Sequence, residues 1–520
     1  MKIRILYIGI LWGLLLNLTA CNDWLEVISD TEVESSDLLN SEDGFKDAII
    51  GVYINMGDEA AYGKNYTWYA NDLVAFPYKA QTTLSAYRIW QSHQYTSSMA
   101  YDAFEAMWAR SYNVIANINN ILSNLESNKS TLNELTYNLM KGEMLALRAY
   151  LHFDLLRLFG LPNWNQNAEK LTVPYVTEFS KEQTPQRSYS ETAKLLFADI
   201  AEALSCLQND PITGKQDESY YETINRDGFW NDRTKRMNYY AVKALAARAY
   251  MWEGSETNQE VAAQHAQDVI DANPTTWIDL ETFAATTSAD AKDWTFSTEH
   301  LFSLEVMGLA DLCNNHLFQT QFEYEGIKLP SEVVLEVLFI PYEERILQAE
   351  EWGYDEDWNW IMIQPEIKET VVLPSANDVR YHSLLTQVDG GVSYNCMKLY
   401  QSSSYYKIYR NRIPMIKISE MYYIVAENYI RKGQSANALE MLDVVRKHRG
   451  ITEKYDVTAD ASAELTLEYM REFICEGQLL YYWKRTGATC PVSSFELTPE
   501  DLIFPYPRTE ISNGGRQQDL

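Results

Sequence analysis

The sequence predicts a mainly α-helical protein in which helix hairpins stack into a single body, with a large loop-rich insertion that carries a few short strands. Three observations lead to this prediction: long stretches with helical apolar spacing, the repetition of one helix pair, and a central stretch where that spacing fades. The 520 residues, of which 46% are hydrophobic and 22% charged, are enough for one large core or two to three domains.

The chain opens with an apolar leader. Lys2 and Arg4 precede the apolar run 5–16, and small or apolar residues follow it at 18–20. Because a membrane-spanning helix needs about 20 apolar residues, this run is too short to span a bilayer and is typical of a cleaved export signal. We therefore expect residues 1–20 to be a signal peptide.

A cysteine follows the leader directly. Cys21 comes after the small residue Ala20, which resembles the lipobox of bacterial lipoproteins, where the sulfur receives a diacylglycerol before cleavage. Two or three acyl chains anchor a soluble body firmly, since each buried CH₂ contributes about 0.8 kcal/mol. We expect Cys21 to be lipidated and residues 21–40 to form a flexible tether. The alternative is an ordinary secretory signal with a chance cysteine near its end.

Charge and cysteine content exclude several classes of function. The net charge is −30, and removal of Lys2 and Arg4 with the leader makes it −32. Such a charge repels polyanions, so nucleic acid is not expected as a partner, and acidic polysaccharides are disfavoured. The cysteines after Cys21 are odd in number and widely scattered, which predicts neither a disulfide framework nor a zinc site. No metal and no cofactor is expected; these cysteines are Cys206, Cys313, Cys396, Cys475 and Cys490.

Helical patterns begin at Ser41, which precedes two acidic residues and an apolar-periodic stretch and so predicts a helix start. In the stretch 131–160, apolar residues recur at steps of three and four and predict a helix with one stripe facing other helices. The further predicted helices are 100–128, 190–208, 236–254, 257–273, 416–433, 435–448 and 463–485.

Two of the predicted helix pairs resemble each other. Each first helix has alanine, tyrosine and glycine at relative positions 0, 3 and 7, and the second helices also share a spacing of small and apolar residues. Small residues allow helices to approach closely, and the glycine suits a helix end. The pattern resembles the tetratricopeptide repeat, whose hairpins bury their apolar faces by stacking. The matching positions are Ala247, Tyr250 and Gly254 in the first pair and Ala426, Tyr429 and Gly433 in the second.

Between about 275 and 410 helical periodicity fades, while Pro, Gly, Asn and aromatic residues become frequent. Only short candidate strands occur there, such as HLFSLEVM and ETVVLP. We interpret this stretch as an insertion on one side of a single helical domain, 41–520, with a composition that suits a binding surface.

Several blocks in the chain carry a family resemblance. RIPMIKISEMYYIVAENYIRKGQSANALEMLDVVRKHRG (412–450), YMREFICEGQLLYYWKRTG (469–487) and FPYPRTEI (504–511) resemble successive blocks of the SusD/RagB-like lipoproteins. Upstream, MWARSYNVIANINNIL and LRAYLHFDLLRLFGLPNW resemble the N-terminal helices of that family, and the lipobox is in keeping with it. The family usually has an acidic residue shortly before the basic residue of the block after EG, whereas this chain has Tyr481, Tyr482 and Trp483 there. The tail NGGRQQDL lacks an asparagine-proline run, so the resemblance is to a divergent branch and leaves the type of glycan open.

The resemblance implies a surface-exposed glycan-binding lipoprotein of the cell outer membrane, lipid-anchored and facing the exterior. Members of the family capture an oligosaccharide or polysaccharide and deliver it to a SusC-like TonB-dependent transporter without cleaving it. It also implies that the repeat helices contact the transporter and that the ligand lies on the opposite, loop-rich side.

The aromatic content agrees with carbohydrate binding. A sugar offers an apolar CH face to flat rings and a rim of hydroxyls to amides and carboxylates, and the chain has 14 Trp and 36 Tyr. About half of such rings are expected to be core, because large aromatic side chains are highly buried on average. We favour Trp358 and Trp360 over Trp108, whose setting is helical. The candidate ligand-binding residues are Trp68, Tyr69, Asn71, Asp72, Tyr87 and Trp90 in an N-terminal cluster, and Trp352, Tyr354, Trp358, Asn359 and Trp360 in the insertion.

Two other functions are compatible with the sequence. A lipid-anchored repeat protein that only scaffolds other proteins would bury its aromatic residues and leave no exposed ring cluster. A secreted helical glycoside hydrolase would need two carboxylates across a cleft, and the many acidic residues single out no such pair. No nucleophile elbow, HExxH or phosphate-binding glycine loop occurs in the sequence, and we expect no catalysis.

Overall fold

The computed structural model of the chain describes residues 38–79, 86–318, 326–354, 357–364, 366–401 and 409–519. The predicted signal peptide, Cys21 and nearly all of the predicted tether lie outside these residues. No helix in the described part of the chain is long and apolar enough to cross a membrane.

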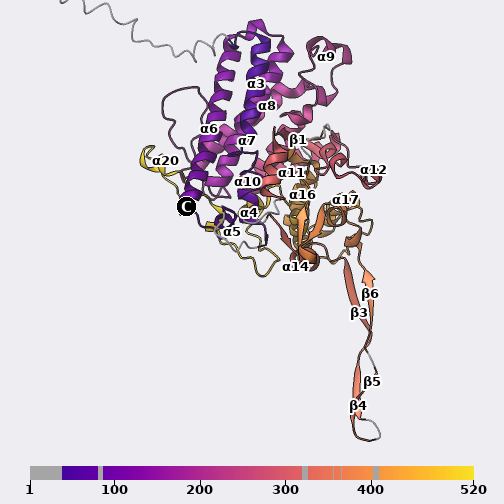
Figure 1. Ribbon diagram of the computed structural model, residues 1–520. Helices are drawn as coiled ribbons and strands as arrows, with labels where there is room; N and C mark the ends of the chain where they lie inside the picture. The colour runs from indigo at the N-terminus through magenta and orange to yellow at the C-terminus, as the bar shows by residue number, and fades with distance from the viewer. Residues whose placement is uncertain are drawn as a thin grey trace, which may run out of the picture.

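Four long helices form one end of the body (Figure 1). Ser41 caps the first of them by accepting a hydrogen bond from the Gly44 N–H, as predicted. The third, α7, packs against α6, α8 and α10 and is buried on nearly all sides rather than along one stripe, because it is the central helix of this group. The four are α3 (Glu42–Met56), α6 (Ser98–Ser127), α7 (Glu134–Phe159) and α8 (Tyr189–Cys206).

The two similar helix pairs form consecutive hairpins that stack on each other. In the first pair α10 packs against α11, in the second α16 packs against α17, and α11 of the first contacts α16 of the second. Gly254 ends α10 in the left-handed conformation, with φ 87°, as its position in the repeat predicts. The prediction of a mainly α-helical fold with tetratricopeptide-like hairpins is confirmed. The helices are α10 (Tyr239–Glu253), α11 (Glu256–Ala272), α16 (Ile418–Arg431) and α17 (Ser435–Lys447).

The predicted helix 463–485 is wrong as a single element. The structure has two helices, α18 (Ala461–Glu472) and α19 (Leu479–Thr486). Between them Cys475 and Gly477 adopt positive φ angles of 60° and 68°, which a continuous helix cannot contain. The other long helices predicted between 98 and 448 agree with the observed ones within about three residues at each end.

The insertion contains short elements, and the two predicted strands are both present. HLFSLEVM forms β1 (His300–Glu305), which pairs antiparallel with β9 (Arg412–Lys417), and ETVVLP ends β6. A small sheet has the order β2–β8–β7. The elements not yet named, apart from those of the ribbon below, are α4 (Ala70–Ala75), α5 (Ala86–Gln91), α9 (Glu218–Ile224), α12 (Leu280–Ala285), α13 (Leu309–His316), β2 (Leu329–Pro330), α14 (Ser331–Val333), α15 (Val379–His382), β7 (Leu385–Val388), β8 (Ser393–Cys396) and α20 (Arg508–Ser512).

A two-stranded ribbon, residues 342–372, projects from the body at the end opposite to the four long helices (Figure 1). Its inner half is β3 (Tyr342–Gln348) paired antiparallel with β6 (Ile367–Val372), and its outer half is β4 (Glu351–Tyr354) paired with β5 (Trp360–Gln364). The described side chains of the ribbon are exposed or half-buried. The sequence predicted irregular structure here, apart from the strand in ETVVLP.

Candidate functional site

The N-terminal cluster of candidate residues lies inside the protein. Its six side chains are at most 6% exposed, so they are part of the core and not of a binding surface. This corrects the prediction that they contact ligand, and it concerns Trp68, Tyr69, Asn71, Asp72, Tyr87 and Trp90.

Several side chains of this cluster make hydrogen bonds or ring contacts within the protein. The Trp68 indole N–H donates to the Gly63 carbonyl at 3.0 Å, and the Tyr87 hydroxyl donates to the His316 carbonyl at 2.8 Å. The Trp90 ring packs against Phe504 with centroids 5.9 Å apart. Such contacts are typical of buried polar and aromatic side chains, and they place these residues in the core.

Asp72 joins two distant parts of the chain. Its carboxylate accepts hydrogen bonds from the backbone N–H of Cys475 at 3.0 Å and of Gly477 at 2.9 Å, and from the Tyr78 hydroxyl. Burial raises the pKa of the Asp72 carboxyl to about 7, although these hydrogen bonds oppose the shift. Asp72 therefore shapes the turn between α18 and α19, which explains why the predicted single helix is interrupted.

The insertion cluster, by contrast, is exposed at the outer end of the ribbon. Trp358 is 81% exposed, Trp360 59% and Tyr354 58%, and Trp352 and Asn359 are exposed as well. In the β4–β5 register Trp352 lies opposite Met362 and Tyr354 opposite Trp360, so these four side chains share one face of the ribbon.

Three of these rings form a group that we call the ring notch: Tyr354, Trp358 and Trp360. The Tyr354 and Trp360 centroids are 4.9 Å apart with the planes at 70°, and those of Tyr354 and Trp358 are 5.7 Å apart at 43°. Trp358 has a positive φ of 61°, which is uncommon for a bulky residue. The ring planes are inclined to one another and do not form a flat platform.

The ribbon is strongly acidic. Residues 342–372 include nine acidic and two basic residues, a net charge of −7. Both basic residues pair with acids of the ribbon itself: Arg345 with Glu343 at 3.2 Å, and Lys368 with Glu366 at 3.3 Å. The charge around the ring notch is therefore negative.

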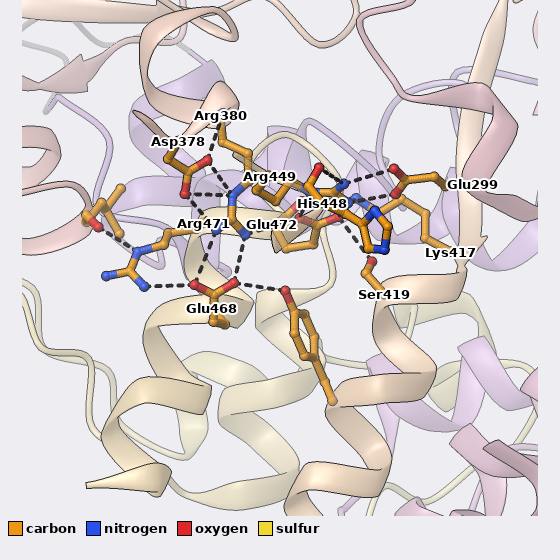
Figure 2. A network of polar contacts seen from close by, with 12 residues as sticks. Glu299, Asp378, Arg380, Lys417, Ser419, His448, Arg449, Glu468, Arg471 and Glu472 are labelled. Carbon is orange, nitrogen blue, oxygen red and sulfur yellow. Dashed lines mark hydrogen bonds and ion pairs between the residues drawn. The ribbon is translucent and has the colours of Figure 1, made fainter. Parts of the chain in front are cut away.

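Both ends of the ribbon are fixed to α18 by a buried ionic cluster (Figure 2). Before β3, the Leu338 carbonyl accepts a hydrogen bond from the Arg471 guanidinium at 2.6 Å. After β6, Arg380 pairs with Asp378 at 2.7 Å. Glu468 on α18 joins the two ends, since it accepts from Arg380 at 2.9 Å and from Arg471 at 2.8 Å.

The cluster continues into the repeat helices. Arg449, which follows α17, pairs with Glu299 and with Glu472, each at 2.7 Å, and none of the three side chains is more than 2% exposed. Lys417 at the end of β9 also pairs with Glu472, at 3.0 Å. The attachment of the ribbon is thus part of the same polar core that joins α17, α18 and β9.

A cleft of about 460 Å³, which we call the body cleft, lies near the attached end of the ribbon. It combines aromatic and apolar side chains with lysine, glutamine, glutamate and serine, which is the mixture that suits a sugar. Lys79 at its edge pairs with Asp389 at 3.6 Å. The lining residues are Phe76, Pro77, Tyr78, Lys79, Gln91, Pro330, Glu332, Val333, Val392, Ser393, Ser494 and Phe495.

The body cleft was not predicted from the sequence. Its residues come from four segments, near 77, 91, 330–333 and 392–393, together with a fifth near 494, so no local motif contains them. The one signal was the position of FPYK next to the N-terminal aromatic cluster. Within the described residues there is no group of three or more His, Cys, Asp or Glu side chains that could hold a metal ion.

Comparison with known proteins agrees with this fold. A family model described as "Starch-binding associating with outer membrane" matches residues 23–251, and one described as "SusD family" matches residues 364–500. No curated protein matches the chain.

Solved structures share the fold over nearly the whole length. A SusD superfamily protein of Bacteroides thetaiotaomicron is 20% identical, with 92% of this chain and 100% of that chain covered and a TM-score of 0.66. A SusD superfamily protein of Bacteroides vulgatus is 18% identical, with coverage of 92% and 98% and a TM-score of 0.64. A putative sugar-binding protein of Bacteroides vulgatus is 16% identical, with coverage of 91% and 96% and a TM-score of 0.58. With two SusD models matched in order over more than half of its length, the chain belongs to the SusD/RagB family.

Proposed function

We propose that the protein is a lipid-anchored outer-membrane protein that captures an oligosaccharide or polysaccharide at the cell surface and delivers it to a SusC-like TonB-dependent transporter, without catalysis. The description of the matched family as starch-binding and outer-membrane-associated supports this proposal. The observation that carries it is the exposed ring notch, because a pure protein scaffold would bury its aromatic residues.

The body cleft provides a second surface for the same ligand. Phe495 is half-buried at its wall, and Lys79, Gln91 and Glu332 supply groups that can meet hydroxyls. A bound sugar at this position would lie against the body itself. The cleft is therefore the place from which we expect delivery to the transporter.

Binding without hydrolysis fits the cleft better than catalysis. Glycoside hydrolysis uses two carboxyl groups that are roughly 5–9.5 Å apart across the bond to be cleaved. Among the described residues that line the body cleft, Glu332 is the one carboxylate. Glu427 and Glu476, which lie within or beside the C-terminal helices, are in ion pairs with Arg485 and Lys398, respectively.

A glycan array with the mature protein tests the binding proposal. We expect at least one glycan to bind with a dissociation constant in the range of about micromolar to millimolar, and to be recovered uncleaved. The double variant Trp358→Ala, Trp360→Ala should weaken binding of a polysaccharide ligand. Tyr220→Ala, which removes an exposed ring from α9 at the other end of the molecule, is the matched control and should change nothing (Figure 1).

Absence of any glycan ligand on the array, or release of shortened products, would contradict the proposal. Anchoring is tested separately by labelling with a radioactive fatty acid, which we expect to mark the native chain and not Cys21→Ser. Purification of the tagged lipoprotein from outer membranes should bring a TonB-dependent barrel with it, and a preparation without one argues against the transporter partner.

A further inference from the structure

We infer that the ribbon is a capture arm for long, uncharged polysaccharide chains, which the protein binds at two separate places: the ring notch and the body cleft. This inference rests on the proposed function and adds the class of ligand and the role of chain length. Short oligosaccharides would occupy the cleft alone.

The ring notch and the body cleft are far apart, but one continuous stretch of the chain joins them. Val333 lines the cleft, and Leu338, five residues later, is hydrogen-bonded to Arg471 at the attached end of the ribbon. From Tyr342, where β3 begins, the strands β3 and β4 extend to Tyr354, about 40 Å away at about 3.3 Å per residue. Figure 1 shows that the ribbon extends away from the body, with β4 and β5 at its outer end.

The ring notch is open to a ligand from solution. Trp358, Tyr354 and Trp360 each expose more than half of their surface, and both tryptophan rings contact Tyr354. The cross-strand pair Tyr354–Trp360 stabilises the ribbon, but both rings remain more than half exposed and belong to no core. Exposed apolar groups of this kind indicate a surface that is covered by a partner.

The charge of the ribbon and the geometry of the rings restrict the class of ligand. A net charge of −7, with both basic side chains already paired, repels uronate- or sulfate-bearing chains and anionic membrane surfaces. Ring planes inclined at 43° and 70° cannot lie together on a flat crystalline surface. They suit a single soluble chain whose sugar faces turn along its length.

Binding at two places explains how the ring notch, although remote from the body cleft, contributes to affinity. Once the ring notch has bound one part of a chain, the next part reaches the body cleft at a raised effective concentration, which strengthens overall binding without any new contact. The gain exists only for chains long enough to span the ribbon. Affinity should therefore depend on chain length, and the ribbon should be the cause.

The test compares a polysaccharide bound by the native protein with an oligosaccharide of the same linkage that is too short to span the ribbon. In one variant, Asn-Gly replaces residues 349–366; this keeps β3, β6 and the ion cluster and closes the shortened ribbon with a two-residue turn. The other variant is Trp358→Ala, Trp360→Ala. Calorimetry should show at least a tenfold loss of polysaccharide affinity in both variants and an unchanged affinity for the oligosaccharide.

The control is Thr370→Ala in β6, which leaves the rings intact and should bind like the native protein. Native affinity should also be nearly independent of salt, since the ligand is uncharged. Equal losses for short and long ligands, or no loss for either, would overturn the inference while leaving glycan binding in place. Loss of the transporter from the complex with unchanged polysaccharide binding would assign the ribbon to a protein partner instead. If the native protein binds no glycan at all, the proposed function itself fails.

Discussion

Glu468 is the residue whose replacement tests the attachment of the ribbon most directly. Its side chain is fully buried and accepts hydrogen bonds from Arg380, Arg471 and the Tyr423 hydroxyl, the last at 3.1 Å. Glu468→Gln keeps the size of the side chain and removes its charge. Two guanidinium groups then lose their shared partner in the interior, although Arg380 retains Asp378.

The structure indicates the size of the effect. Burial alone would raise the pKa of Glu468, but the charges of Arg380 and Arg471 outweigh it and lower the pKa from 4.5 to about 2. At about 1.4 kcal/mol per unit, this shift corresponds to about 3 kcal/mol of stability near neutral pH. Removing one partner of a buried ion pair typically costs about 3–5 kcal/mol, which is of the same order.

Urea denaturation at pH 7, followed by tryptophan fluorescence and far-UV circular dichroism, measures this loss. The pH dependence has a defined sign, because the pKa is lower in the folded than in the unfolded state: the contribution is complete above about pH 4.5 and declines as the pH falls toward 2. The difference between native protein and Glu468→Gln should therefore narrow below pH 4.5.

Glu464→Gln on the same helix is the matched control, since Glu464 forms no ion pair within the described residues, and it should cost less than about 0.5 kcal/mol. Limited proteolysis near 338–342 and 373–378 should be faster in Glu468→Gln than in the control. A loss below about 1 kcal/mol, or a loss of the same size at pH 7 and at pH 3.5, would refute the proposed role of Glu468.

Two further predictions concern the turn between α18 and α19. The pKa of Asp72 is raised to about 7, so folding favours its protonated form. As the pH rises from about 4 to 7, the native protein should therefore lose stability relative to Asp72→Asn, by at most about 1.4 kcal/mol per pH unit. A difference in the free energy of unfolding that stays constant over this pH range would contradict the prediction. Gly477→Ala should cost about 3 kcal/mol or more, because φ is 68° and a Cβ atom would lie 2.2 Å from the Thr67 carbonyl oxygen. Gly433→Ala, with φ 72° and no atom within 4 Å of the added Cβ, should cost only about 1 kcal/mol, and equal thermal shifts in the two variants would show that the close approach is unimportant.

The helical part of the fold was predictable because its information is local. The spacing of Ala247, Tyr250 and Gly254 and its repeat in the second pair depend on residues within one or two turns, and the structure forms both hairpins. The break after Glu472 was not predictable in this way. The Cys475 and Gly477 backbone N–H groups there donate hydrogen bonds to Asp72, about 400 residues earlier in the chain, and no window of the sequence contains both partners.

Whether an aromatic side chain of the candidate site is buried could not be predicted from nearby residues either. Both aromatic clusters have similar compositions, yet Trp68 is fully buried and Trp358 is 81% exposed. Trp68 lies beside His316 of α13, with ring centroids 6.2 Å apart, and this cover comes from a remote segment. Around Trp358 the sequence did contain a signal, since turn-forming DEDWN lies between two stretches rich in apolar and β-branched residues, which is typical of a hairpin.

The position of the ionic cluster suggests why charged and not apolar side chains lie at the attached end of the ribbon. Buried ion pairs contribute little net stability compared with well-packed apolar residues, so stability alone does not account for Arg380, Glu468 and Arg471 at this place. What ion pairs and guanidinium hydrogen bonds supply is direction, because each requires a particular approach of its partner. A ribbon about 40 Å long magnifies any rotation at its attached end: about 6° there displaces the ring notch by about 4 Å. The capture arm proposed above would need its attached end to be fixed in orientation, and the cluster fixes both of the ribbon's connections to a single helix, α18.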